Sequence, residues 1–173
     1  DMVLGNANGK AEVWMNPGMH AGLGTAAAFE LPSSYGVTDI ELSDVNRDGL
    51  DDLVMVIGST GTVRTILNPG TPGASGSIGA VEIAWSTQTF TDVTPPNTPR
   101  QVEAADVNKD GHIDLVVGTS ANAAIYFGDK KSTSSGSFAG IASVFVGSTA
   151  GMAALDAQAL EVVDVDGDGW VDL

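Results

Sequence analysis

The chain contains no cysteine and only two histidines among its 173 residues. The absence of cysteine excludes disulfides and thiolate chemistry. Two histidines argue against a transition-metal site built from imidazole ligands. The sequence also lacks a nucleophile elbow, a phosphate-binding P-loop and a zinc-protease motif. We therefore expect a protein that is not an enzyme.

Positive charge is also scarce. Lys and Arg together number 7 against 22 Asp and Glu residues, which gives a formal net charge of −15. Such a surplus of negative charge repels the phosphates of nucleic acids and the headgroups of anionic membranes. No apolar run approaches the roughly 18 residues that a membrane span requires. We therefore expect neither nucleic-acid binding nor membrane insertion.

Helical patterning is nearly absent, and the chain is instead divided into units of about 60 residues. Each unit holds four short β-rich segments separated by Gly, Pro, Asn and Ser. In the second unit these segments lie at 53–57, at 63–67, around Phe90 and just before residue 106. Four short strands in a unit of this length are typical of one blade of a β-propeller. The sequence therefore predicts an all-β chain with three four-stranded β-propeller blades.

The same acidic loop occurs three times. Oxygen-bearing side chains stand at loop positions 1, 3, 5 and 9, and a glycine stands at position 6. Alternate side chains can then point toward a cation, while the glycine allows the sharp turn. The predicted ligands are these side chains and the carbonyl oxygen of position 7: Asp44, Asn46, Asp48, Leu50 and Asp52; Asp106, Asn108, Asp110, His112 and Asp114; Asp164, Asp166, Asp168, Trp170 and Asp172. Asp1 matches position 9 of a further loop and is predicted as a partial site.

Calcium is the cation that these loops fit best. Five protein oxygens plus water or a bidentate carboxylate reach the six to eight ligands of Ca²⁺, whereas Mg²⁺ prefers a tighter octahedron with more water. An EF-hand would place a carboxylate at position 12, where this chain has Met55 and Val117. We therefore expect three calcium ions, one in each intact loop, bound in hairpin loops. The alternative is that the loops are Asx-rich turns without metal.

The third loop differs from the other two in charge. It offers four carboxylate ligands instead of three, and it has Gly167 where the other loops have Arg47 and Lys109 at position 4. More negative charge and the lack of a nearby basic residue both favour cation binding. We therefore expect the third loop to bind calcium most tightly.

The loop pattern D-x-[DN]-x-D-G-x-x-D-L-V, followed by a glycine and a further pair of β segments, resembles the FG-GAP/VCBS repeat family. The segment AIYFGD at 124–129 is similar to the Phe-Gly element of that family. The resemblance implies blades of the integrin-α type, calcium affinities of ~10⁻⁴–10⁻³ M as in extracellular modules, and an extracellular or cell-surface location. It also implies a role in adhesion or structure, with a protein or glycan ligand bound through loops at the top of the blades.

We divide the chain into repeats at 1–52, 53–114 and 115–173, which together form one repeat domain. Asp1 and Asp172 occupy the same phase of the repeat, so the first repeat begins and the third ends within a blade. Three blades cannot close a ring with normal sheet twist, so we expect part of a longer propeller or array. Two alternatives stay open: a filament assembled from neighbouring repeats or copies of the chain, and a lectin or polysaccharide-active propeller.

Two sets of residues have competing interpretations. A glutamate stands three residues before each loop, and the three form either an acidic ring along a channel or a solvated polar face, which we favour. They are Glu41, Glu103 and Glu161. Three aromatic residues either stack on sugars or pack between blades, and their positions within strands favour packing. They are Trp14, Trp85 and Tyr126.

Overall fold

The computed structural model describes residues 2–5, 11–14, 29–30, 36–68, 90–128, 138–146 and 159–172. Within these ranges the regular structure consists of strands joined by turns, and there is no helix. This part of the chain accordingly holds no apolar helix of membrane-spanning length. The all-β class expected from the sequence is confirmed.

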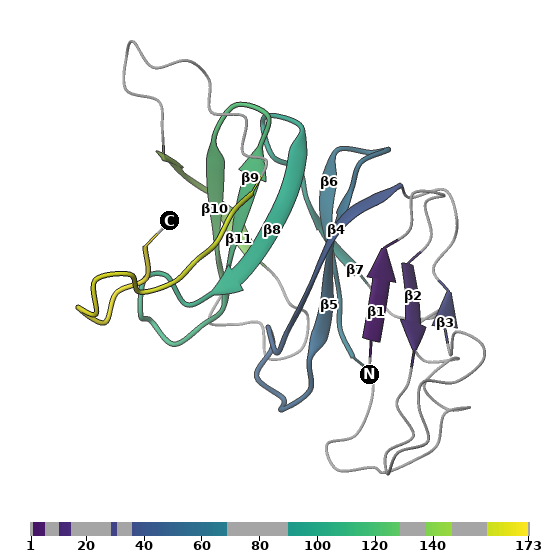
Figure 1. Ribbon diagram of the computed structural model, residues 1–173, viewed down its shortest axis with the longest axis horizontal. Coiled ribbons are helices and arrows are strands. Elements are labelled where there is room, and N and C mark those ends of the chain that lie inside the picture. Colours follow the sequence, from purple (N-terminus) through teal and green to yellow (C-terminus); the bar gives the residue numbers. More distant parts are fainter. Residues whose placement is uncertain are drawn as a thin grey trace.

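The strands form three antiparallel sheets that follow one another along the chain (Figure 1). The strand order is β1-β2-β3 in the first sheet, β4-β5-β6-β7 in the second and β11-β10-β9-β8 in the third. The strands are β1 (Met2–Gly5), β2 (Ala11–Trp14), β3 (Phe29–Glu30), β4 (Val37–Ser43), β5 (Asp52–Ile57), β6 (Thr62–Ile66), β7 (Phe90–Val93), β8 (Pro99–Ala105), β9 (Asp114–Thr119), β10 (Ala123–Gly128) and β11 (Phe138–Val146).

The described residues contain two four-stranded sheets and one three-stranded sheet, whereas the sequence predicts three units of four strands. The difference has a topological reason. The first and second acidic loops each join the first strand of a sheet to its second strand, so β4 pairs with β5 across the first loop, with Ser43 opposite Asp52. β4 therefore belongs to the second sheet, and β1–β3 form the first sheet without it.

The second strand of each four-stranded sheet is its most deeply buried element. Every residue of β5 and of β9 is buried. A strand that is covered on both faces needs apolar side chains at nearly every position, which explains the continuous apolar runs at 53–57 and 115–117. By contrast, β4 and β8 mix buried with half-buried or exposed positions, as expected for strands at a sheet edge.

One hydrophobic core lies between the second and third sheets. Alternate residues of each strand point to the same face, so one face of each sheet supplies the cluster. Its buried members are Val54, Val56, Val63, Val93, Val102, Leu115, Val117, Ala124 and Tyr126. Only 2% of Tyr126 is exposed, which confirms its interpretation as a core residue. Trp85 lies outside the described residues, and only the backbone of Trp14 is described.

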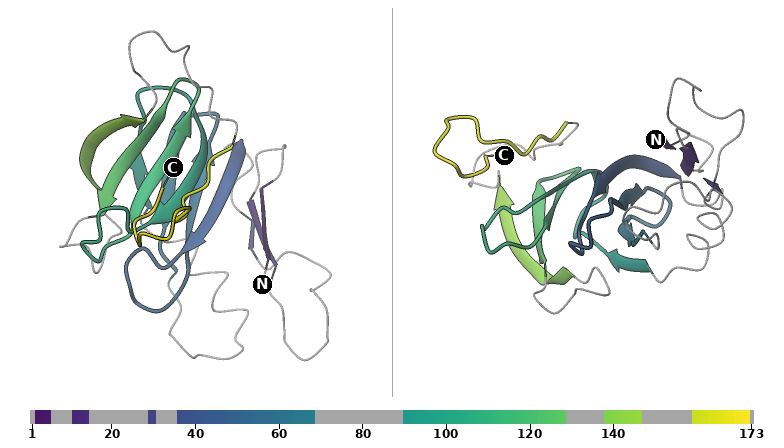
Figure 2. Two further views of the ribbon diagram at one scale, coloured as in Figure 1. Left: turned by 60° about the vertical axis from the view of Figure 1, so that its left-hand side comes forward. Right: turned by 90° about the horizontal axis from the view of Figure 1, so that it is seen from below.

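Packing of the sheets face to face brings their first strands together. β4 and β8 are neighbours in space (Figure 2). The backbone N–H of Val102 in β8 donates a 2.8 Å hydrogen bond to Oδ2 of Asp39 in β4. Because β8 is an edge strand of its sheet, this N–H points away from the ladder. Asp39 therefore ties the edge of the third sheet to the second sheet.

Candidate metal centres

The first two acidic loops lie at the same end of their sheets (Figure 1). The first loop joins β4 to β5, and the second joins β8 to β9. The third loop follows the isolated bridge between Val163 and Asp172. That bridge pairs the same loop positions as the Ser43–Asp52 and Ala105–Asp114 pairs of the other two loops. The three loops are thus presented in the same way by the fold.

The carboxylate at position 1 organises each loop from within. In the first loop, Oδ1 of Asp44 accepts from the N–H of Asp48 at 3.0 Å, and Oδ2 accepts from the N–H of Gly49 at 2.8 Å. Asp106 makes the equivalent two bonds in the second loop. Position 6 needs glycine because its φ is +88° at Gly49, a left-handed conformation that other residues rarely adopt. The turn within each loop therefore depends on the aspartate at position 1 and the glycine at position 6.

The carboxylate at position 5 accepts the N–H of position 7 in every loop. The distances are 3.0 Å from Leu50 to Asp48, 2.9 Å from His112 to Asp110 and 2.7 Å from Trp170 to Asp168. This bond fixes the peptide that precedes the carbonyl group of position 7. The carbonyl oxygens of Leu50, His112 and Trp170 stay predicted ligands.

The aspartate at position 9 anchors the loop to its sheet. Asp52 and Asp114 are fully buried. Oδ2 of Asp52 accepts the N–H of Val45 at 3.0 Å, and Oδ1 accepts the N–H of Asn68 at 2.7 Å, just beyond the end of β6. Asp114 repeats this arrangement with position 2 of its loop and with Gly128 at the end of β10. In the first two loops, the position-9 aspartate therefore joins the loop to the third strand of the same sheet.

Burial raises the pKa of the Asp52 and Asp114 carboxyl groups. Desolvation raises the pKa of Asp52 to about 6, although the backbone N–H groups of Asn68, Asn46 and Val45 oppose the shift. Desolvation likewise raises the pKa of Asp114. A carboxylate whose pKa is raised by burial is stabilised in its charged form by a nearby cation. The position-9 carboxylates are therefore well suited to face a bound metal ion.

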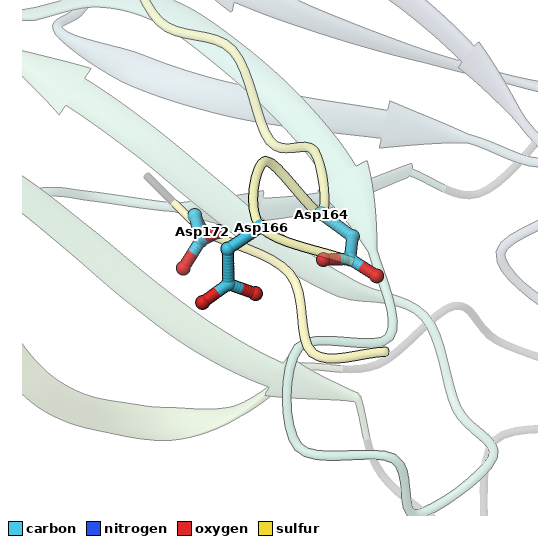
Figure 3. Close-up of side chains that lie close together, drawn as sticks. All are labelled: Asp164, Asp166 and Asp172. Carbon is cyan, nitrogen blue, oxygen red and sulfur yellow. The ribbon is translucent and has the colours of Figure 1, made fainter. Parts of the chain in front are cut away.

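Three carboxylates of the third loop converge on one point (Figure 3). One oxygen from each of Asp164, Asp166 and Asp172 lies within 4.8 Å of the others. Oxygens that ligate one Ca²⁺ at 2.3–2.6 Å lie at most about 5 Å apart, so this group fits a calcium ion. Asp168 is not in the group and holds the N–H of Trp170 instead. The structure thus brings positions 1, 3 and 9 together.

In the first two loops, position 3 is an asparagine. Oδ1 of Asn46 accepts the N–H of Asp48 at 3.0 Å, and its amide donates to Oδ2 of Asp48 at 3.0 Å. Asn108 and Asp110 make the same two contacts, at 2.8 Å and 3.3 Å. The third loop shares the bonds from position 5 to position 3, from position 6 to position 1 and from position 7 to position 5, but there Oδ1 of Asp164 accepts the N–H of Gly167 at position 4 instead of that of position 5. Asp1, the predicted partial site, lies outside the described residues.

The glutamates that precede the loops influence one another. Burial raises the pKa of Glu41 to about 7, with smaller contributions from the charges of Glu103, Asp39, Glu161 and Asp51. Burial also raises the pKa of Glu103, with help from Glu161 and Asp39. The first strands of neighbouring sheets therefore place acidic groups within electrostatic reach of one another. Asp39 was not predicted as a member of this acidic group, although it stands two residues before Glu41 and therefore on the same face of the strand.

Comparison with known families confirms the expected resemblance to FG-GAP repeats. A family model described as an FG-GAP-like repeat matches residues 44–117 and, in a second overlapping match, residues 106–173. Each match begins at position 1 of an acidic loop and runs into or through the next loop. No curated protein and no solved structure matches the chain significantly. The two family matches together cover most of the chain, which therefore belongs to the FG-GAP-like repeat family.

Proposed function

We propose that this chain is a calcium-stabilised repeat module of an extracellular or cell-surface protein, with a role in adhesion or structural assembly and without enzymatic activity. The observation that carries the proposal is the convergence of Asp164, Asp166 and Asp172 within 4.8 Å. The other two loops share with it the bonds from position 6 to position 1 and from position 7 to position 5. All the side-chain donors are hard oxygen ligands, which suit Ca²⁺ better than a softer transition metal.

In this proposal the chain holds each ion with positions 1, 3, 5 and 9 and the carbonyl oxygen of position 7. A bound ion supplies positive charge to carboxylates that otherwise repel one another. The protein contributes the fixed loop, whose position-9 aspartate is bonded to the third strand of the sheet in the first two loops. Ion binding therefore stabilises the attachment of the loop to the sheet as well as the loop itself.

We also propose that the sheets are blades of a β-propeller. Two consecutive four-stranded antiparallel sheets pack face to face, and their first strands lie side by side (Figure 2). Loops at the ends of such blades are common binding surfaces, and a protein or glycan ligand is the expected partner. The extracellular location follows from the calcium proposal, because weak calcium sites fill only where the free ion is abundant.

The direct test is calcium titration by calorimetry together with thermal unfolding. We expect about three binding events with weak affinity, and a Tm that is higher in calcium than in chelator. A triple variant with Asp44→Ala, Asp106→Ala and Asp164→Ala should lose both effects. An unchanged Tm in chelator together with no heat of binding would overturn the proposal.

A second candidate, a filament of assembled copies, is favoured by one surface. Val165 stands at position 2 of the third loop and is 77% exposed, and Val163 and Trp170 beside it are also exposed. Val45, the position-2 residue of the first loop, packs instead against the core between the second and third sheets. A further repeat from a second copy would cover Val165 in the same way. Light scattering across a concentration series tests this, since Val165→Asp should abolish any self-association.

A further inference from the structure

The residue at position 4 of each loop has an unusual backbone conformation. Arg47 and Lys109 have positive φ angles of 61° and 55°, and Gly167 has a φ of 78°. The left-handed region is costly for residues with a side chain, so these two are held there by the loop around them.

Both basic side chains extend to the next loop along the chain. Nζ of Lys109 lies 4.1 Å from the centroid of the Trp170 ring, which is position 7 of the third loop. A Cβ atom placed on Gly169, position 6 of that loop, would lie 3.4 Å from the same nitrogen. A Cβ atom on Gly111, position 6 of the second loop, would likewise lie 3.4 Å from Nη1 of Arg47. Position 4 of one loop therefore covers position 6 of the next, and it does so twice.

The charges of the neighbouring loops complement this arrangement. Each receiving loop has at least three carboxylates among its predicted ligands. The glycine at position 6 leaves room for the approaching basic group, and the Trp170 ring offers its face to the ammonium group of Lys109. The arrangement ends at the third loop, since Gly167 has no side chain to extend further.

We propose that Arg47 and Lys109 are clasps between loops: each holds the following loop in place and lowers the calcium affinity of that following loop. The effect on affinity rests on the calcium function proposed above, whereas the clasp itself does not. The same geometry corrects one reason for expecting the third loop to bind most tightly. That loop lacks a basic residue of its own, but Lys109 from the second loop lies over it.

The clasp has opposite effects with and without calcium. In chelator, the basic group attracts carboxylates that no ion neutralises, so it stabilises the fold. In calcium, the same positive charge repels the incoming ion, so it weakens binding. Lys109→Gln should therefore lower the Tm in chelator and tighten calcium binding at the third loop. Exposed charges that lie near one another on a protein surface correspond to a change in affinity of about two- to fivefold.

Trp170 makes the third loop observable by its fluorescence. The signals of Trp14 and Trp85 are removed by subtracting the spectrum of Trp170→Phe under the same conditions. Calcium titration of the full chain should then show tighter binding at the third loop in Lys109→Gln and wild-type binding in Lys109→Arg. Arg47→Gln is the matched control. It also replaces a basic residue at position 4 with glutamine, but Arg47 covers the second loop and not the third. It should leave the Trp170 titration unchanged.

The possible results separate this inference from the calcium proposal. If the wild type binds no calcium, the calcium proposal fails, and the Tm of Lys109→Gln in chelator still tests the clasp. A Tm in chelator equal to that of the wild type and of Lys109→Arg would overturn the clasp. If calcium binds but Lys109→Gln and Arg47→Gln shift the Trp170 titration equally, the effect is one of general charge, and the assignment to the next loop is wrong.

Discussion

At the scale of single residues, the position-9 aspartate matters for the fold before any ion binds. Asp114 is fully buried, and its two oxygens accept the N–H groups of Val107 and Gly128 at 3.0 Å and 2.8 Å. Asp114→Ala leaves both donors without this acceptor, so we expect a loss of about 2–4 kcal/mol in the free energy of unfolding even in chelator. Urea denaturation in chelator measures this loss.

The matched control for that prediction is Asp110→Ala in the same loop. Asp110 is exposed and accepts the N–H of His112 within its own turn. We expect the free energy of unfolding of this variant in chelator to fall by less than about 1 kcal/mol. Its calcium affinity should fall as much as that of Asp114→Ala. Equal losses for the two variants in chelator would show that position 9 has no special structural role.

Gly128 is the residue where an added methyl group should be most damaging among the described glycines. A Cβ atom there would collide with the backbone oxygen of Ile113 and lie 3.1 Å from the Cβ of His112. We expect Gly128→Ala to destabilise the fold by about 1–3 kcal/mol, because backbone atoms have to move. Gly167→Asn is the control, since space around Gly167 is open and asparagine tolerates its positive φ. Thermal unfolding of both variants in chelator compares them.

At the scale of strands and sheets, Asp39 is expected to hold neighbouring sheets together. Its carboxylate accepts the N–H of Val102 across the contact between β4 and β8. Asp39→Ala removes that acceptor and should lower the free energy of unfolding by about 1–3 kcal/mol. Asp39→Asn keeps an acceptor oxygen and should lower the free energy of unfolding clearly less than Asp39→Ala does. Burial raises the pKa of Asp39 and thus disfavours its charged form, so loss of the charge itself is well tolerated. Urea denaturation at neutral pH distinguishes the two variants.

The acidic groups on the first strands give stability a defined dependence on pH. The pKa of Glu41 is raised from 4.5 to about 7 in the folded state, mainly by burial. A raised pKa means that the folded state holds the proton more strongly than the unfolded chain, so this group favours folding at low pH. That contribution declines as the pH rises from about 4.5 to about 7.

Glu41→Gln removes this dependence. Because the group is partly solvated, solvent screening reduces the effect. We expect the free energy of unfolding of the variant to exceed that of the wild type by about 1 kcal/mol at pH 8, and to equal it or fall slightly below it at pH 4. Chemical denaturation across this pH range measures the difference. A constant difference at all pH values would mean that the ionisation of Glu41 is not its cause.

The elements show which parts of the structure can be predicted from the sequence. The sequence predicts strands at 53–57 and 63–67, and the bounds of β5 (Asp52–Ile57) and β6 (Thr62–Ile66) agree with them to within one residue at each end. Such runs are predictable because alternation and apolar content are local properties. The bond between Asp39 and Val102 joins residues 63 positions apart, and no local pattern indicates it. It depends on how two sheets pack.

The loops illustrate the same limit. Ligand spacing and the glycine at position 6 are visible in the sequence because each loop forms from adjacent residues. The direction of the Arg47 and Lys109 side chains is not visible, because it depends on a left-handed backbone at a residue that is not glycine. The sequence therefore suggested that each basic residue acts on its own loop, whereas the structure places it over the next.

At the scale of the whole molecule, the net charge of −15 should make stability without calcium strongly dependent on salt. Self-repulsion of so many carboxylates opposes folding, and each bound calcium ion offsets two of the negative charges. Sodium chloride screens the same repulsion without occupying the loops, because the Debye length falls to about 3 Å at 1 M salt.

We therefore expect added sodium chloride to raise the Tm in chelator by more than it raises the Tm in calcium, so that the gap between the two narrows. Magnesium chloride at equal ionic strength is the control for ion identity, and it should narrow the gap little more than sodium does if the loops select calcium. Calorimetric scans in the two salts measure both effects. Equal salt dependence with and without calcium would mean that the acidic loops do not dominate the electrostatics of folding, and the stabilising role of the metal would then have to come from loop ordering alone.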